Sequence, residues 1–145
     1  MTLEPSLIDS DVLSLLSRGH PAVSAFAADY LHRFGRLTLS AVTVFERLRG
    51  YRDAIRRGLP FEPQMRQFEA LAAASLVLPV DARVADVAAR IWAHASRARR
   101  RALGDILIAA TASANALPLA TRNRRDFDAL GKAPGVALRL VDWTR

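Results

Sequence analysis

Residues 104–121 read GDILIAATASANALPLAT, and this stretch decides the fold class. Its first part is apolar on every side when drawn as a helix, which predicts a helix buried all round. The apolar run over residues 117–121 then predicts a buried strand. The uncharged part of the stretch is too short and too polar to cross a membrane. A buried helix that leads into a buried strand is typical of α/β proteins.

The same alternation continues toward both ends of the chain. Strands are predicted over residues 6–9, 36–39, 76–80, 117–121 and 136–141, and helices over residues 11–17, 21–33, 41–57, 63–74, 82–95, 106–116 and 126–130. Ser40 and Asp81 are natural N-caps for the helices that follow them. Short apolar strands that alternate with helices favour a parallel sheet covered by helices on both faces.

Length and composition limit the class of protein. The chain has 145 residues and shows no repeat or linker, so we expect a single domain over residues 1–145. It contains no cysteine, which excludes disulfides and thiolate metal sites. The N-terminus shows no charged-then-apolar leader, so we expect a cytoplasmic protein without a membrane partner.

The chain is basic, with a formal net charge of +7, and Lys132 is the one lysine among its 21 basic residues. The planar guanidinium group pairs well with phosphate oxygens, so a nucleic-acid partner is consistent with this composition. Two alternatives stay open. A GC-rich genome favours arginine codons over lysine codons, and a basic surface also suits an acidic protein partner.

Acidic side chains follow the predicted strands where the strands end. Asp9 follows the first strand, and Asp126 lies shortly after the fourth. Asp105 opens the buried helix, and Glu46 lies about two turns into the helix after the second strand. Ligands of parallel sheets bind outside the carboxyl ends of the strands, so these four groups are expected to converge. Carboxylates brought together repel one another unless a cation lies between them, and oxygen ligands suit Mg²⁺ or Mn²⁺.

Each acid also has a structural alternative. Asp9 or Asp11 could cap the first helix, and Asp105 and Asp126 could cap the helices that they open. Glu46 lies nearly opposite the apolar side of its helix, where an exposed surface glutamate is the ordinary interpretation. These alternatives stay open at the level of sequence.

Two groups of arginines accompany the predicted acids. Arg99, Arg100 and Arg101 lead into Gly104-Asp105, and Arg122, Arg124 and Arg125 precede or adjoin Asp126. Either group could be a solvated surface run. Acids that hold a metal beside arginines that hold phosphate are also the arrangement that phosphoryl transfer uses. The three histidines show no ligand spacing, Trp92 is expected in the core, and Trp143 could be an anchor.

Four blocks in order are similar to the PIN-domain ribonucleases, and within them to VapC-type toxins of toxin–antitoxin pairs. The blocks are LIDSDVLS (7–14), LSAVTVFERLRG (39–50), GDILIAATASANALPLATRN (104–123) and RRDFDAL (124–130). Ser10 replaces the threonine that is more usual in this family, and Ile106 follows Asp105 where alanine is commoner. These departures are mild.

This resemblance implies a three-layer α/β/α sandwich and a set of site residues. Asp9, Glu46, Asp105 and Asp126 would be the acidic quartet, with Asp9, Asp105 and Asp126 as ligands of Mg²⁺ or Mn²⁺. Asp11, Thr121, Asn123 and Asp128 would support them. The six arginines named above would contact RNA phosphate or an antitoxin. The resemblance also implies a homodimer, an RNA substrate that is hydrolysed, and a cognate antitoxin protein that inhibits the enzyme.

Two other functions are compatible with parts of the sequence. A PIN-like protein could bind nucleic acid without cleaving it, with its acids playing structural roles. An apolar strand followed by Asp-x-Asp also opens the haloacid-dehalogenase phosphatases, in which Asp9 would be the nucleophile. That family needs a lysine upstream of its last acidic motif, whereas Lys132 follows Asp126.

Overall fold

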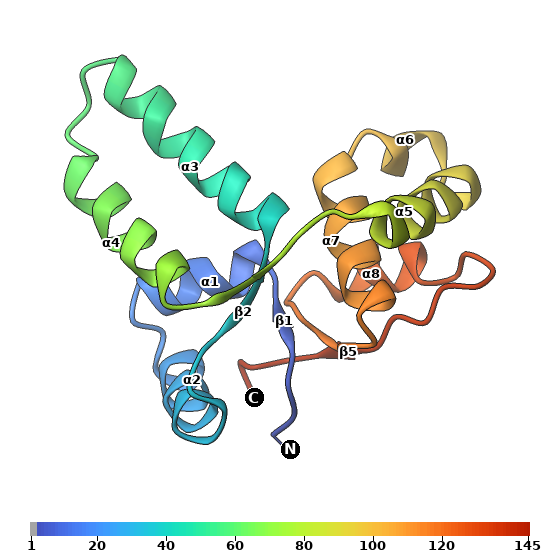
Figure 1. Ribbon diagram of the computed structural model, residues 1–145, viewed down its shortest axis with the longest axis horizontal. Helices are drawn as coiled ribbons and strands as arrows, with labels where there is room; N and C mark the ends of the chain where they lie inside the picture. The colour runs from blue at the N-terminus through green and yellow to red at the C-terminus, as the bar shows by residue number, and fades with distance from the viewer. Residues whose placement is uncertain (1–2) are drawn as a thin grey trace.

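The computed structural model describes residues 3–145 and contains a five-stranded parallel sheet (Figure 1). The strand order is β3-β2-β1-β4-β5, so β1 and β4 lie side by side although they come from opposite ends of the chain. The strands are β1 (Leu7–Ile8), β2 (Thr38–Ser40), β3 (Leu76–Leu78), β4 (Leu119–Ala120) and β5 (Leu140–Val141). Each strand lies inside or overlaps its predicted range, and the predicted parallel α/β class is confirmed.

Eight helices accompany the strands in the described part of the chain. They are α1 (Ser10–Ser17), α2 (Pro21–Phe34), α3 (Ala41–Arg56), α4 (Glu62–Ala73), α5 (Ala82–His94), α6 (Arg97–Arg100), α7 (Leu103–Ala114) and α8 (Arg124–Leu130). Ser40 and Asp81 cap α3 and α5 through their side chains, as predicted. The arginine-rich segment forms the short helix α6, which was not predicted from the sequence. No helix within residues 3–145 has the length and apolarity needed to cross a membrane.

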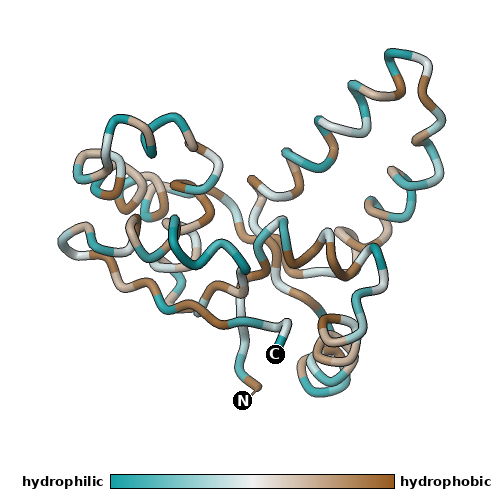
Figure 2. Tube along the Cα trace, turned by 180° about the vertical axis from the view of Figure 1, so that it is seen from behind, coloured by the Kyte–Doolittle hydropathy of each residue, from teal (hydrophilic) through white to brown (hydrophobic). Residues whose placement is uncertain are grey.

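The alternation of side chains along β1 and β4 divides the core into two layers. Leu7 and Leu119 pack with α5, α7 and α8 on one face of the sheet. Ile8 and Ala120 pack with α1, α2 and α4 on the other face. Successive residues of a strand point to opposite faces, so these short strands supply both cores at once. Figure 2 shows hydrophobic residues along the central strands, and hydrophilic ones recurring in α3 and α4, which project as a pair.

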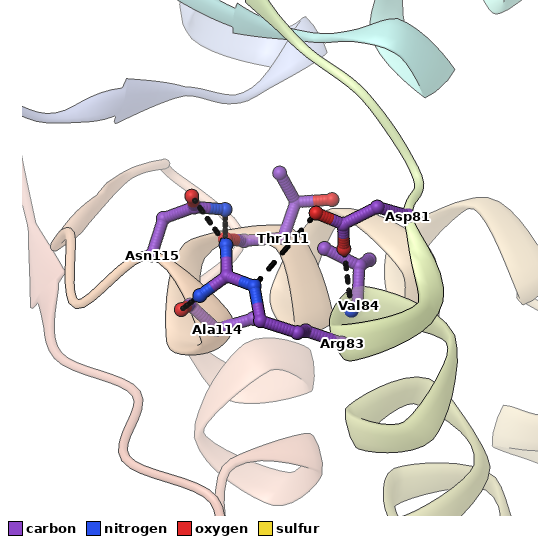
Figure 3. A network of polar contacts seen from close by, with 6 residues as sticks. All are labelled: Asp81, Arg83, Val84, Thr111, Ala114 and Asn115. Atoms are coloured by element: carbon purple, nitrogen blue, oxygen red, sulfur yellow. Dashed lines mark hydrogen bonds and ion pairs between the residues drawn. The ribbon is translucent and has the colours of Figure 1, made fainter.

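A polar network fixes α5 against the end of the buried helix α7 (Figure 3). Asp81 accepts a hydrogen bond of 3.0 Å from the backbone N–H of Val84, which caps α5. Arg83 donates to the carbonyl oxygen of Ala114 at 3.2 Å and to Oδ1 of Asn115 at 3.4 Å. These carbonyl and amide oxygens lie at the C-terminus of α7, where a positive charge is favourable. The network therefore helps to set the register between α5 and α7.

One tryptophan differs from its expected place, and the other takes the anchoring place that the sequence allowed. Trp92 is 45% exposed and lies under the guanidinium group of Arg100, 4.0 Å from the ring centroid, so its assignment to the core is wrong. Trp92 sits at the edge of the apolar stripe of α5, and Ile91 takes the buried position. Trp143 is 1% exposed, and its ring centroid lies 4.7 Å from that of Phe26 and 5.3 Å from that of Tyr30. It anchors the C-terminal segment against α2.

Replacing Trp143 by alanine should lower the free energy of unfolding by about 3–5 kcal/mol, because a large side chain leaves a packed aromatic cluster. Replacing Trp92 by alanine should cost about 0.5–1 kcal/mol, since mainly an exposed cation–π contact is lost. Urea unfolding followed by circular dichroism measures both variants. Equal losses would contradict the assignment of Trp143 as the anchor.

Candidate active site

The carboxyl ends of β1, β2 and β4 deliver polar side chains to one edge of the sheet. Asp9 follows β1 directly, and Thr121 follows β4. Ser40 ends β2 and caps α3, which carries Glu46 two turns further on. Parallel strands end at the same edge, so this convergence follows from topology and not from proximity in sequence.

Asp9 is the most buried acid of the site, with 5% of its surface exposed. Its Oδ1 accepts a hydrogen bond of 2.8 Å from the backbone N–H of Ser10, so it is also the N-cap of α1. Its Oδ2 accepts a hydrogen bond of 2.9 Å from Oγ1 of Thr121. Burial, and then the negative charge of Asp11, raise the pKa of Asp9 to about 7. Capping of α1 therefore does not remove Asp9 from the candidate site.

Thr121 and Asn123 connect this carboxylate to the loop after β4. Thr121 is buried, donates to Asp9, and accepts a hydrogen bond of 3.0 Å from the backbone N–H of Asn123. Asn123 therefore contributes its backbone to the site. The side chain of Asn123 forms no cap bond to α8. Thr121 thus contacts Asp9 directly, whereas Asn123 contacts Thr121.

Asp105 lies in the first turn of α7 and is flanked by other acids. Burial raises its pKa, and the negative charges of Glu46, Asp126 and Asp11 raise it further, in that order. Asp105 does not cap α7, since Ala102 occupies the N-cap position without a side-chain bond. Mutual electrostatic influence thus joins five acids into one carboxylate cluster. Its members are Asp9, Asp11, Glu46, Asp105 and Asp126.

Glu46 reaches the cluster because position 104 is a glycine. A Cβ atom at Gly104 would lie 2.5 Å from Oε2 of Glu46, which is far closer than such atoms approach. Oγ of Ser10 donates a long hydrogen bond of 3.4 Å to Oε1 of the same carboxylate. No role was predicted for Gly104 from the sequence. The signal was present, as a glycine directly before the acid that opens the buried helix.

Asp126 and Asp128 differ in their surroundings. Asp126 forms an ion pair of 3.3 Å with Nη2 of Arg99. It is the third residue of α8, so it is not the N-cap that the alternative interpretation required. Asp128 is exposed and lies 3.9 Å from Arg124 in an ion pair along α8. Asp128 is thus directed to the surface, away from the side chains that influence Asp105.

The six predicted arginines separate into different environments. Arg99 faces the carboxylate cluster. Arg100 covers Trp92 and donates to the carbonyl oxygens of Trp92 and Ala93, which holds α6 against the end of α5. The backbone N–H of Arg122 donates to Oδ2 of Asp11 at 3.0 Å. The exposed side chains of the set are those of Arg101, Arg122, Arg124 and Arg125.

Two cavities meet at Asp105. The larger cavity has a volume of about 640 Å³, and its lining includes Phe45, Glu46, Arg49, Leu103 and Asp105. The smaller cavity has a volume of about 240 Å³ and is lined by Ala98, Arg99, Ala102, Asp105, Asp126 and Leu130. A ligand in this crevice would therefore meet carboxylates at its centre and guanidinium groups on both sides, with apolar side chains beside them.

The cluster offers oxygen donors of the kind that hard divalent cations prefer. Oδ1 of Asp11 is buried and lacks a hydrogen-bond partner among residues 3–145, so it is an available acceptor. Across those same residues no group of three or more His, Asp or Glu side chains is spaced to hold a metal ion. Carboxylates gathered at one edge repel one another, and a divalent cation between them would offset that repulsion. The chemistry of the donor set therefore fits a divalent cation.

The model of the PIN-domain family matches residues 6–133 of the chain. The chain therefore belongs to the PIN-domain family, which confirms the family resemblance found in the sequence. No curated protein matches the chain significantly. The family match gives the haloacid-dehalogenase alternative no support.

Solved structures of toxin–antitoxin complexes share the fold. A chain of DNA-bound VapBC from Salmonella typhimurium has a TM-score of 0.73 and 21% identity, covering 97% of this chain and 99% of that one. A chain of VapBC-1 from nontypeable Haemophilus influenzae has a TM-score of 0.72 and 21% identity, covering 97% and 98%. A toxin–antitoxin complex from Klebsiella pneumoniae gives a TM-score of 0.58 and 23% identity, covering 91% and 95%. At sequence identities of 21–23%, these matches show that the structures share the fold of this chain.

The raised pKa of Asp9 makes the stability of the metal-free protein depend on pH. Protonated Asp9 favours the folded state, and this contribution is complete below the ordinary pKa of 3.8 and lost as pH rises through about 7. Wild-type stability should therefore fall between pH 4 and pH 8 relative to Asp9→Asn, by about 2–4 kcal/mol. Urea unfolding in the presence of a chelator measures the difference, with Asp29→Asn on the exposed face of α2 as the control. Parallel pH profiles for wild type and Asp9→Asn would contradict the buried, raised carboxyl.

Gly104→Ala should displace the carboxylate of Glu46 without unfolding the protein, because the clash falls on the flexible end of a side chain. When the negative charge of Glu46 moves away from Asp105, the pKa of Asp105 should fall toward its ordinary value. NMR titration of the Asp105 side-chain carboxyl carbon measures this change. Gly50→Ala is the matched control, since a Cβ there has nothing within 4 Å. An unchanged pKa of Asp105 in Gly104→Ala would contradict the position of the Glu46 carboxylate beside Asp105.

Proposed function

We propose that this protein is a metal-dependent ribonuclease of the VapC type, which hydrolyses RNA phosphodiester bonds and is inhibited by a cognate antitoxin. The observation that carries the proposal is the carboxylate cluster. Five acids from four segments meet at the carboxyl edge of a PIN-domain sheet, and burial together with the neighbouring carboxylates raises the pKa values of two of them. Purely structural acids do not require such mutual repulsion, whereas a cation site does.

Asp9, Asp105 and Asp126 are the side chains that would hold Mg²⁺ or Mn²⁺, with Asp11 able to supplement them. Such a cation, when bound, supplies a water of lowered pKa and neutralises charge that develops on the phosphate. Glu46 would orient a water or accept its proton, since Ser10 donates to its carboxylate and Gly104 leaves room for that carboxylate near Asp105. Thr121 fixes the rotamer of Asp9 through its hydrogen bond.

The net charge of +7 and the arginines around the crevice support a nucleic-acid substrate. Arg101 and Arg49 line the larger cavity together with Glu46 and Asp105, so phosphates next to the cleaved bond would meet guanidinium groups. Contacts of this kind position a strand and carry little sequence information.

The toxin–antitoxin complexes among the structural neighbours support an antitoxin partner for this chain as well. A segment of that partner would lie over the crevice and cover the acids. The homodimer and the cytoplasmic location stay predictions from the resemblance and the sequence. So does the assignment of residues 1–145 to a single domain.

The non-catalytic alternative is a PIN-domain protein that binds nucleic acid and uses its acids structurally. Both functions include RNA binding, but only the ribonuclease cleaves RNA. A cleavage assay therefore distinguishes them, whereas a binding assay does not. A mixed pool of cellular RNA, incubated with the purified protein and Mn²⁺ and then mapped for new 5′ ends, provides that readout.

Asp9→Asn and Asp126→Asn should each reduce RNA cleavage by roughly 100-fold or more, because a site that loses a ligand loses several kcal/mol of transition-state stabilisation. Asp128→Asn is the matched control, since it makes the same substitution on α8 at a residue paired with Arg124 at the surface. It should cleave at the wild-type rate. Wild-type protein that binds Mn²⁺ and RNA but creates no new 5′ ends would favour the non-catalytic alternative.

A further inference from the structure

We propose that Arg99 is an internal counter-ion of the carboxylate cluster. Its guanidinium group pairs with Asp126, and it would turn toward the phosphate of a bound nucleic acid when a divalent cation takes its place at Asp126. This inference rests on the proposed function and assigns Arg99 the role of a positioning residue that couples cation binding to substrate binding.

The contact between Arg99 and Asp126 is weak enough to be exchanged. The two side chains are 30% and 48% exposed, and their single ion-pair distance is 3.3 Å. Pairs of this exposure contribute little to stability, because solvent screens them. A guanidinium group can bind a carboxylate through two parallel hydrogen bonds, but here it uses one. A divalent cation therefore competes with a modest interaction for Asp126.

The guanidinium group is also incompletely bonded. Its Nε is buried and has no hydrogen-bond partner within the described residues. A buried donor without a partner is costly, and a group of this kind gains when another state supplies the partner. A phosphate has several oxygens arranged to accept from two nitrogens of one guanidinium group. Such a ligand would complete the bonding that Asp126 leaves open.

The smaller cavity gives the side chain room to exchange partners. Arg99, Asp105 and Asp126 all line this volume of about 240 Å³. A guanidinium group that leaves Asp126 would therefore still face this cavity. A phosphate beside a cation held by Asp105 and Asp126 would lie within this space.

The backbone of Arg99 is held within α6, whereas the end of its side chain is held by the single contact with Asp126. Oγ of Ser96 accepts a hydrogen bond from the backbone N–H of Arg99 at 3.3 Å. The neighbouring Arg100 donates to the carbonyl oxygens of Trp92 and Ala93 at 2.9 and 3.1 Å, which ties α6 to α5. The two adjacent arginines therefore have different roles. Arg100 fixes α6 against α5, and Arg99 directs its positive charge toward Asp126.

The test is the affinity for Mn²⁺, measured by isothermal titration calorimetry without any nucleic acid. Arg99→Gln should bind Mn²⁺ roughly threefold to tenfold more tightly than wild type, because a competing positive charge has been removed. Arg97→Gln removes the same charge from the same helix at an exposed residue and should bind Mn²⁺ as wild type does. Arg99→Lys keeps a cation and should fall between wild type and Arg99→Gln. Thermal unfolding checks that all variants are folded.

A second measurement tests the release toward phosphate. A fluorescein-labelled phosphorothioate oligoribonucleotide serves as the probe, with anisotropy read in chelator and in saturating Mn²⁺. Mn²⁺ should tighten probe binding to wild type, and Arg99→Gln should lose most of that gain. Unchanged or weaker Mn²⁺ binding by Arg99→Gln, or a full Mn²⁺-dependent gain in that variant, would overturn the inference. Wild-type protein that binds no Mn²⁺ would instead overturn the proposed metal-dependent function itself.

Discussion

The parallel pairing of β1 with β4 is the constraint on which the site depends. Leu7 pairs with Leu119 and Ile8 with Ala120, and the backbone N–H of Asp9 donates to the carbonyl oxygen of Ala120 at 2.9 Å. This register places Asp9 beside Thr121, so a carboxylate from one end of the chain meets a hydroxyl group from near the other end. A shift by one residue would turn Ile8 and Ala120 to the wrong core, and it would also separate that pair.

Once the sheet has formed, the molecule must tolerate several carboxylates at one edge. Several hydrogen bonds to the carboxylates each offset a small part of this repulsion. A backbone N–H donates to Asp9, another donates to Asp11, and the Thr121 hydroxyl group completes the environment of Asp9. These donors do not cancel the effects of burial and repulsion, because the pKa values of Asp9 and Asp105 remain raised. An imbalance of this kind is typical of sites whose charge balance is completed by a ligand.

The arginine-rich segment illustrates how neighbouring residues of one type acquire different roles. Arg100 supports the fold by covering Trp92 and by binding carbonyl oxygens at the end of α5. Arg99 faces Asp126, and Arg101 lines the larger cavity. A helix turns successive side chains by about 100 degrees, so adjacent arginines necessarily point to different neighbours. Composition alone therefore indicates a basic region without indicating which arginine meets the acids.

Local patterns in the sequence predict the α/β class, the order of strands and helices, and the N-caps Ser40 and Asp81, because these depend on periodicity and on bonds between near neighbours. The sequence also pointed to the four acids, since side chains that follow parallel strands share an edge. The tertiary structure decided what each residue faces. Trp92 is exposed and Trp143 is buried. The Glu46 carboxylate lies against Gly104, and Arg99 pairs with Asp126. Helical periodicity gives the direction of a side chain, but the partner in that direction comes from a segment far away in the sequence.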